Sequence, residues 1–165
     1  MPGITIMSKH HKLYLDIANR YAADKSGCTK VTVGAVIVKN YGKANENVIA
    51  MGANRAIPDL CLVRGCQRIE LYGNAAKEHR LPSDCRAIHS EVDAISKASE
   101  SVEGCDIFVT RYPCEACART IVAAGIKRVW FGRTQPISDQ TADIFERAGV
   151  EVHWLKEWEE ADRND

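Results

Sequence analysis

Two short segments combine residue types that can bind a metal ion and move protons. The first is His89-Ser90-Glu91, and the second is Pro113-Cys114-Glu115-Ala116-Cys117. Cysteines three positions apart lie on one side of a helical turn, so both sulfurs can reach one ion. A histidine adds a third ligand, and three protein ligands leave one tetrahedral position for water, as in catalytic zinc sites. We therefore predict a catalytic Zn²⁺ held by His89, Cys114 and Cys117.

The charge of this ligand set gives Glu91 a role. Two thiolates cancel the charge of Zn²⁺, so the metal acidifies its water less than an all-imidazole site would. A nearby base must take that proton, and Glu91 is the candidate. Residues i and i+2 point about 200° apart inside a helix, so His89 and Glu91 can serve one centre only in an open first turn.

Each segment alone has simpler explanations. A lone Cys-x-x-Cys is also half of a structural zinc site or a redox dithiol, and a lone His-x-Glu carries little information. The combination of both, separated by some tens of residues, resembles the signature of zinc-dependent nucleobase deaminases. The pair of segments therefore favours catalytic zinc.

The elements that must position these residues follow from hydrophobic periodicity and from Gly and Pro. The predicted helices are about 8–24, Glu91–Ala98 with Val92 and Ile95 inward, Cys114–Ala124 and Asp139–Ala148. The predicted strands are Val33–Val38, Asn47–Met51, Asp106–Thr110, Arg128–Phe131 and Val150–Val152. From Asp106 onward strands and helices alternate, which favours parallel strands covered by helices. Residues 54–86 are predicted to be an irregular loop, either functional or stapled by metal, and the acidic tail from Glu157 is predicted to fray at its end.

Composition limits the class of protein. A length of 165 residues fits a single domain, 1–165. Lys plus Arg equals Asp plus Glu at 22 each, and the missing basic excess disfavours a nucleic-acid partner. No apolar run approaches the roughly 20 residues that cross a membrane, so we predict a cytoplasmic protein. In that compartment the seven cysteines are expected as ligands, nucleophiles or core thiols.

On its motifs the sequence resembles the deoxycytidylate deaminases of the cytidine deaminase-like superfamily. The matching segments are Val33–Val38, Gly52–Asn54, Cys85–Glu91, Thr110–Cys117 and Gly125–Val129. The resemblance implies an α/β fold, a three-layer αβα sandwich with a five-stranded mixed sheet. It implies hydrolysis of dCMP to dUMP and ammonia, on the route to dTTP. It further implies a homo-oligomer, a hexamer in several members, with dCTP as activator and dTTP as inhibitor.

The resemblance also assigns site residues. His89, Cys114 and Cys117 match its metal ligands, and Glu91 matches its proton shuttle. Asn54 matches an asparagine that contacts the sugar. The candidates for contacts to the base or phosphate are Arg111 and Tyr112.

Two positions depart from the pattern of the resembled family. Arg55 stands where glycine is usual, and Asp93 stands where asparagine is frequent. The first departure affects phosphate and effector recognition, and the second affects how the nucleotide loop is held. Arg55 is itself a candidate phosphate ligand.

Some related deaminases carry a second, structural zinc, and this chain has cysteines in similar places. The predicted ligands are Cys28, Cys61, His79 and Cys85, with Cys66 as the alternate. Buried thiols are the simpler explanation of the same residues.

Two other functions remain open. One is another deaminase of the same fold, acting on a nucleoside, on guanine or on tRNA adenosine, although the charge balance disfavours tRNA. The other is a non-catalytic zinc scaffold that binds partners through the long loop.

Overall fold

The computed structural model describes residues 3–73, 85–134 and 139–162, and these residues form a mixed sheet with helices on both faces. The strands are β1 (Gly3–Ile4), β2 (Gly34–Lys39), β3 (Asn47–Ala53), β4 (Asp106–Arg111), β5 (Arg128–Arg133) and β6 (Glu151–Trp154), in the order β1-β6-β5-β4-β2-β3. The strands from β1 to β4 in this order are parallel, and β2 runs antiparallel to both of its neighbours. The predicted αβα sandwich is confirmed, with six described strands rather than five because Gly3–Ile4 adds a short edge strand.

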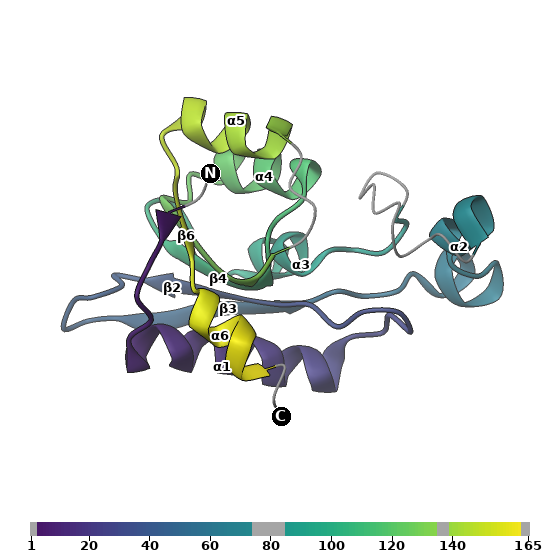
Figure 1. Ribbon diagram of the computed structural model, residues 1–165, viewed down its shortest axis with the longest axis horizontal. Coiled ribbons are helices and arrows are strands. Elements are labelled where there is room, and N and C mark those ends of the chain that lie inside the picture. Colours follow the sequence, from purple (N-terminus) through teal and green to yellow (C-terminus); the bar gives the residue numbers. More distant parts are fainter. Residues whose placement is uncertain (1–2, 74–84, 135–138, 163–165) are drawn as a thin grey trace.

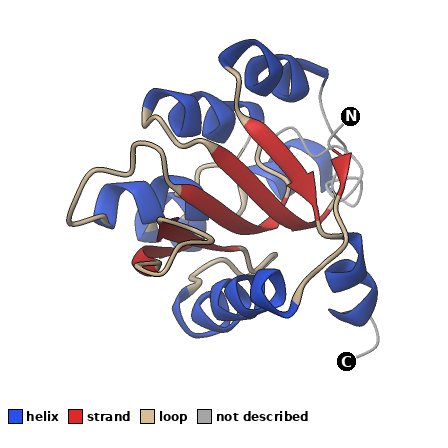
Figure 2. Cartoon of the chain, turned by 90° about the vertical axis from the view of Figure 1, so that its left-hand side faces the viewer, coloured by secondary structure: helices blue, strands red, loops and turns tan. Residues whose placement is uncertain are grey.

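The helices form the two outer layers (Figures 1 and 2). One face carries α1 (Lys9–Lys25) and α6 (Lys156–Asp162), and the other carries α3 (Ser90–Lys97), α4 (Glu115–Ala123) and α5 (Asp139–Ala148). A separate apolar cluster fills each side of the sheet. Within the described part of the chain, every helix is too short or too polar to cross a membrane.

The first helix packs closely on the sheet. The Ser8 hydroxyl accepts a hydrogen bond from the His11 N–H, which fixes the start of α1. A Cβ at Gly34 would lie 1.9 Å from the Ala18 carbonyl oxygen, so only glycine lets α1 approach β2 this closely. The helix ends at Ser26, as its sequence predicts.

Another glycine sets the position of α3. A Cβ at Gly52 in β3 would lie 2.2 Å from the Ser90 carbonyl oxygen and 2.4 Å from the Ala94 nitrogen. The buried residues of α3 are Ser90, Glu91, Asp93 and Ala94. Of the two residues that were expected to point inward, Ile95 packs partly buried against the core, and Val92 is only partly buried. Two acidic side chains are among the fully covered residues of this helix, which the sequence did not predict.

Two further expectations from the sequence need correction. The loop 54–86 contains a π-helical segment, η1 (Pro58–Val63), and a helix, α2 (Gln67–Tyr72), which lies away from the sheet (Figure 1). The sequence did not predict α6 (Lys156–Asp162) in the acidic tail, and the end of the tail, which was expected to fray, lies outside the described residues. The buried Trp158 ring packs over Gly132 and donates a hydrogen bond to Asp16 at 2.9 Å, which anchors α6.

Candidate active site

Three ligand-type side chains meet where α3 and α4 begin. The Nδ1 atom of His89 lies 3.4 Å from the Cys114 sulfur and 3.3 Å from the Cys117 sulfur. Both cysteines are buried, and all three ligand atoms lie within 4.8 Å of one another. We call this set, His89, Cys114 and Cys117, the His–Cys–Cys corner. The structure thus brings together the three residues that the sequence predicts as ligands.

Helix starts produce this convergence. His89 is the N-cap of α3 and has an extended backbone, with φ −77° and ψ 153°. Cys114 is the N-cap of α4, and its sulfur accepts a hydrogen bond from the Cys117 N–H at 3.5 Å. Two of the three ligands are therefore N-cap residues at helix starts. Because His89 lies outside the helical turns, Glu91 can face the same centre.

The electrostatics of the corner favour a bound cation. Hydrogen bonds from Cys117 and His89 lower the pKa of Cys114 to about 4 against the opposing effect of burial. The pKa of Cys117 is raised, because its hydrogen bond with Cys114 and its burial oppose a second negative charge. The hydrogen bonds with Cys114 and Cys85 raise the pKa of His89 to about 11. A divalent cation relieves the repulsion between two adjacent thiolates.

Zinc also fits the spacing of the donor atoms. Tetrahedral zinc with ordinary Zn–S and Zn–N bonds separates nitrogen from sulfur by about 3.5 Å. The two observed separations, 3.4 and 3.3 Å, are close to this value. Among the described residues, this is the one group of three ligand types that converges in this way.

Glu91 lies next to the corner and is shielded from solvent. Its exposed fraction is 4%, and the Ser90 hydroxyl donates to its carboxylate at 3.1 Å. Its carboxylate also forms a hydrogen bond with the Cys117 thiol. Burial raises the pKa of Glu91 above its ordinary value, although the charge of His89 opposes this. Such a carboxyl group binds a proton more readily than an exposed one does.

Asn54 is buried and holds the chain around it. Its side-chain oxygen accepts hydrogen bonds from the Ser26 hydroxyl at 2.7 Å and from the Val33 N–H at 2.8 Å. Its side-chain nitrogen donates to the Val31 carbonyl at 2.7 Å. The predicted contact of Asn54 with a sugar remains a prediction. The hydrogen bond between Asn54 and Ser26 was not predicted, because the sequence identified Ser26 only as the end of a helix.

The two residues that depart from the family pattern contact each other. The Arg55 Nε donates to the Asp93 carboxylate at 2.7 Å. Asp93 is fully buried and also accepts from Lys97 at 2.7 Å. Burial alone would raise the pKa of Asp93, but the bonds from Lys97 and the Ala53 N–H hold it below the ordinary value.

The loop that enters α4 holds the last two candidates. The Tyr112 ring is buried and meets the Phe131 ring edge-on, with centroids 4.9 Å apart, and burial raises its pKa to about 12. Arg111 ends β4 opposite Arg133 of β5. Their contacts with a nucleotide remain predictions.

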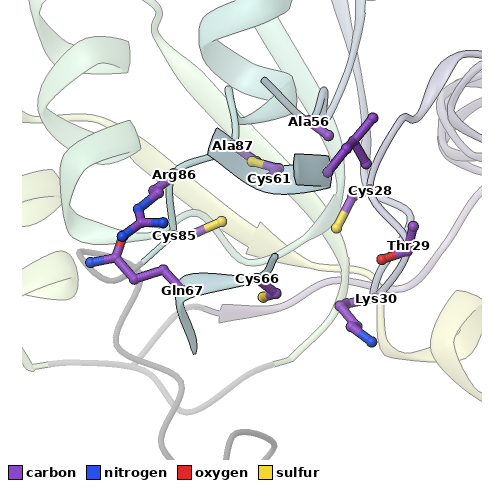
Figure 3. Close-up of a pocket in the computed structure, with 11 residues that line it drawn as sticks. Cys28, Thr29, Lys30, Ala56, Cys61, Cys66, Gln67, Cys85, Arg86 and Ala87 are labelled. Carbon is purple, nitrogen blue, oxygen red and sulfur yellow. The ribbon is translucent and has the colours of Figure 1, made fainter. Parts of the chain in front are cut away.

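Four half-buried, free cysteines line one pocket beside the corner (Figure 3). They are Cys28, Cys61, Cys66 and Cys85, and we call this region the cysteine pocket. Figure 3 shows the sulfurs of Cys28 and Cys85 directed into it. Cys85 also forms a hydrogen bond with His89, which joins the pocket to the corner and lowers the pKa of Cys85. His79, the fourth expected ligand, lies outside the described residues.

Comparison with known proteins agrees with this geometry. The model of the cytidine and deoxycytidylate deaminase zinc-binding region matches residues 8–133. The ComE operon protein 2 of Bacillus subtilis (strain 168) is 33% identical over 148 residues, which cover 87% of this chain and 70% of that protein. The deoxycytidylate deaminase of Mycobacterium phage D29 is 33% identical over 125 residues, covering 70% of this chain and 88% of that enzyme.

A solved structure extends the similarity to the fold. The dCMP deaminase of the cyanophage S-TIM5, in complex with dCMP and dUMP, superposes with a TM-score of 0.65 and 26% sequence identity. The match covers 92% of this chain and all of that one. Fold and site together define an α/β hydrolytic deaminase of a zinc-binding class. The chain belongs to the cytidine and deoxycytidylate deaminase family.

Proposed function

We propose that this protein hydrolyses dCMP to dUMP and ammonia, with zinc held by His89, Cys114 and Cys117. The observation that carries the proposal is the buried Glu91 carboxylate beside three converging ligand atoms. A purely structural zinc would have four protein ligands and no need of a buried acid at its side. This arrangement disfavours a non-catalytic scaffold.

The residues of the site suit hydrolysis at a cytosine ring. A bound zinc ion would supply Lewis-acid activation of the attacking water. Glu91 would accept a proton from that water and deliver it to ring N3, and then help to protonate the amine that leaves C4. Its raised pKa supports this use as base and acid in turn. Asn54, Arg111 and Tyr112 are the candidates for holding the nucleotide, whereas Arg55, the fourth candidate from the sequence, has its side chain on Asp93.

The choice of dCMP over other amines rests on similarity. The relative from phage D29 is a deoxycytidylate deaminase, and the cyanophage structure contains dCMP and dUMP. Incubating the zinc-loaded protein with dCMP, deoxycytidine, dCTP, guanine or adenosine tests this choice. We expect equal amounts of dUMP and ammonia from dCMP, at the highest kcat/KM of the set. Deamination of another compound with dCMP left unchanged would refute the proposal.

We also propose a second, structural zinc in the cysteine pocket. Thiolates are good zinc ligands, and such a site would fasten the loop that follows β3. Cys28, Cys61 and Cys85 are the expected ligands, and Cys66 lines the same pocket. His79 is the other candidate for the fourth position.

Further features of the proposed enzyme follow from the same resemblance. We propose that it acts in the cytoplasm, as one domain spanning 1–165, on the route to dTTP. We propose a homo-hexamer that dCTP activates and dTTP inhibits. Sedimentation velocity tests the hexamer, and dCMP saturation curves with and without dCTP or dTTP test the regulation.

A further inference from the structure

Arg55 is attached to the segment that carries His89 and Glu91 at both of its ends. Before the segment, the Arg55 N–H donates to the Ile88 carbonyl at 2.8 Å, and the Ile88 N–H donates back to Arg55 at 2.9 Å. After the segment, the Arg55 Nε and Nη2 atoms each lie 2.7 Å from the same oxygen of Asp93. The three residues His89-Ser90-Glu91 therefore lie between two attachments to one residue.

The attachment through Asp93 is buried and has several donors. Asp93 has an exposed fraction of 0%, and its second oxygen accepts from the Ala53 N–H at 3.1 Å and from Lys97 at 2.7 Å. A buried carboxylate is tolerated only with such partners, and breaking a buried pair is costly. The Arg55 side chain is 45% exposed, so it can be replaced without leaving a hole in the core.

The start of α3 needs an external attachment. The helix has eight residues, and isolated helices of that length are unstable in water. The usual fastening at the N-terminus is a side-chain cap, but His89 makes no capping hydrogen bond. The side chains of His89 and Glu91 face the corner instead, so neither fastens the first turn to β3.

We propose that Arg55 is a positioning residue, which holds the His89–Glu91 segment against the end of β3 so that Glu91 faces the corner. The inference rests on the proposed deaminase function. It differs from a role of Arg55 as a phosphate ligand, because it acts through Asp93 and Ile88 and not through the nucleotide.

The two roles predict different kinetics for Arg55→Ala. Loss of a positioning contact lowers kcat for dCMP about ten- to hundredfold and changes KM less than about threefold, because a misplaced catalytic group slows the chemical step. Loss of a phosphate contact raises KM and leaves kcat unchanged, and that result would overturn the proposal. Arg55→Lys keeps one charge-assisted bond and should recover part of kcat.

Hydrogen exchange tests the attachment without any activity measurement. Arg55→Ala removes the attachment to Asp93 and keeps the backbone bonds with Ile88. We therefore expect the amides of residues 90–93 to exchange at least about tenfold faster in this variant, because local opening of that end becomes easier. The matched control is Arg147→Ala, since the Arg147 Nε pairs with Asp143 at the same 2.7 Å but on the exposed surface of α5. Unchanged exchange in Arg55→Ala would refute the attachment. If the wild-type protein deaminated none of the compounds, the proposed function would be refuted. The exchange result would still test whether Arg55 holds the His89–Glu91 segment.

A double variant identifies the partner. If Arg55 acts through Asp93, Arg55→Ala combined with Asp93→Asn should lower kcat no more than the stronger single variant does. If the double variant lost kcat by the product of the two single losses, this coupling would be contradicted. If Asp93→Asn fails to fold, Lys97→Met can be used in its place, because Lys97 donates to the other oxygen of Asp93. We expect Lys97→Met to lower kcat less than Arg55→Ala does.

Discussion

The His–Cys–Cys corner and the cysteine pocket contain the same kinds of ligand but differ in how they are built. The corner takes its ligands from the N-caps and first turn of two helices that pack on the sheet, and its three ligand atoms lie within 4.8 Å of one another. The pocket takes its cysteines from the loop after α1, from η1, from the start of α2 and from the approach to α3. No comparable convergence of three ligand atoms occurs there among the described residues.

The difference shows what positions a metal ligand. In the corner, helix geometry and packing bring the three ligands together. In the pocket, loops must be brought together, so the binding energy of a metal would have to order them. Regular elements suit a catalytic site, whose geometry must be maintained through the reaction, whereas loops suit a structural one.

The largest effect should come from removing a ligand of the corner. We expect Cys114→Ala to lose the catalytic zinc and at least about a thousandfold in deamination rate, because two ligands remain and Lewis-acid activation is worth several kcal/mol. Zinc content and ammonia release measure this. Cys105→Ala is the control, since Cys105 is equally buried and lies outside both sites. A Cys114→Ala protein that kept zinc and rate would remove the corner from the mechanism.

Removing the acid should separate metal binding from turnover. We expect Glu91→Gln to keep its zinc and to lose about a hundred- to thousandfold in kcat, since general acid–base catalysis contributes on that order. The control is Glu115→Gln, which changes a partly exposed acid in the first turn of α4. Retention of most of the rate by Glu91→Gln would show that another group moves the protons.

A change in packing tests whether regular elements build the corner. We expect Gly52→Ala to push α3 away from β3 and to lower the free energy of unfolding by about 1–3 kcal/mol, the usual cost of overpacking. The rate of deamination should fall as well, because His89 and Glu91 both lie at the start of α3. Thermal melts and rates are compared with Gly3→Ala, whose added methyl group meets open space. An unaffected rate would mean that the corner does not depend on this packing.

The smallest effect on catalysis is expected from the pocket. We expect Cys61→Ser to release one of two bound zinc ions, to lower the melting temperature, and to change kcat by less than about threefold, because the loop lies outside the reacting centre. Metal analysis of the wild-type protein is the reference. A single zinc per chain in that reference would contradict the second site.

Much of the fold is predictable because its signals are local. The helices α1, α3, α4 and α5 and the strands β2 to β6 occur within a few residues of their predicted positions, since periodicity and glycines mark them. β1 has two residues, too few for any pattern. The helix α6 depends on the packing of Trp158 against Gly132, a contact between distant residues that no local pattern reveals.

In the candidate site, too, the features with local signals were predictable and the contacts between distant residues were not. Cys114 and Cys117 follow from spacing within one helical turn, and His89 follows from its place before Glu91 at a predicted helix start; the structure brings the three together. The pairing of Arg55 with Asp93 joins residues 38 positions apart and could not be read from either position alone. The burial of Asp93 was also hidden, because a charged residue is normally expected at the surface. The Arg55–Asp93 pair and the burial of Asp93 both depend on how closely α3 lies on β3.

The proposed site is tested most directly by a crystal structure of Glu91→Gln with dCMP, with anomalous data collected on both sides of the zinc absorption edge. We expect a zinc peak bonded to His89 Nδ1 and to the sulfurs of Cys114 and Cys117. We also expect no fourth protein ligand, and the side chain at position 91 beside the pyrimidine ring. A fourth protein ligand on this zinc, or a side chain at position 91 turned away from the base, would contradict the proposed site.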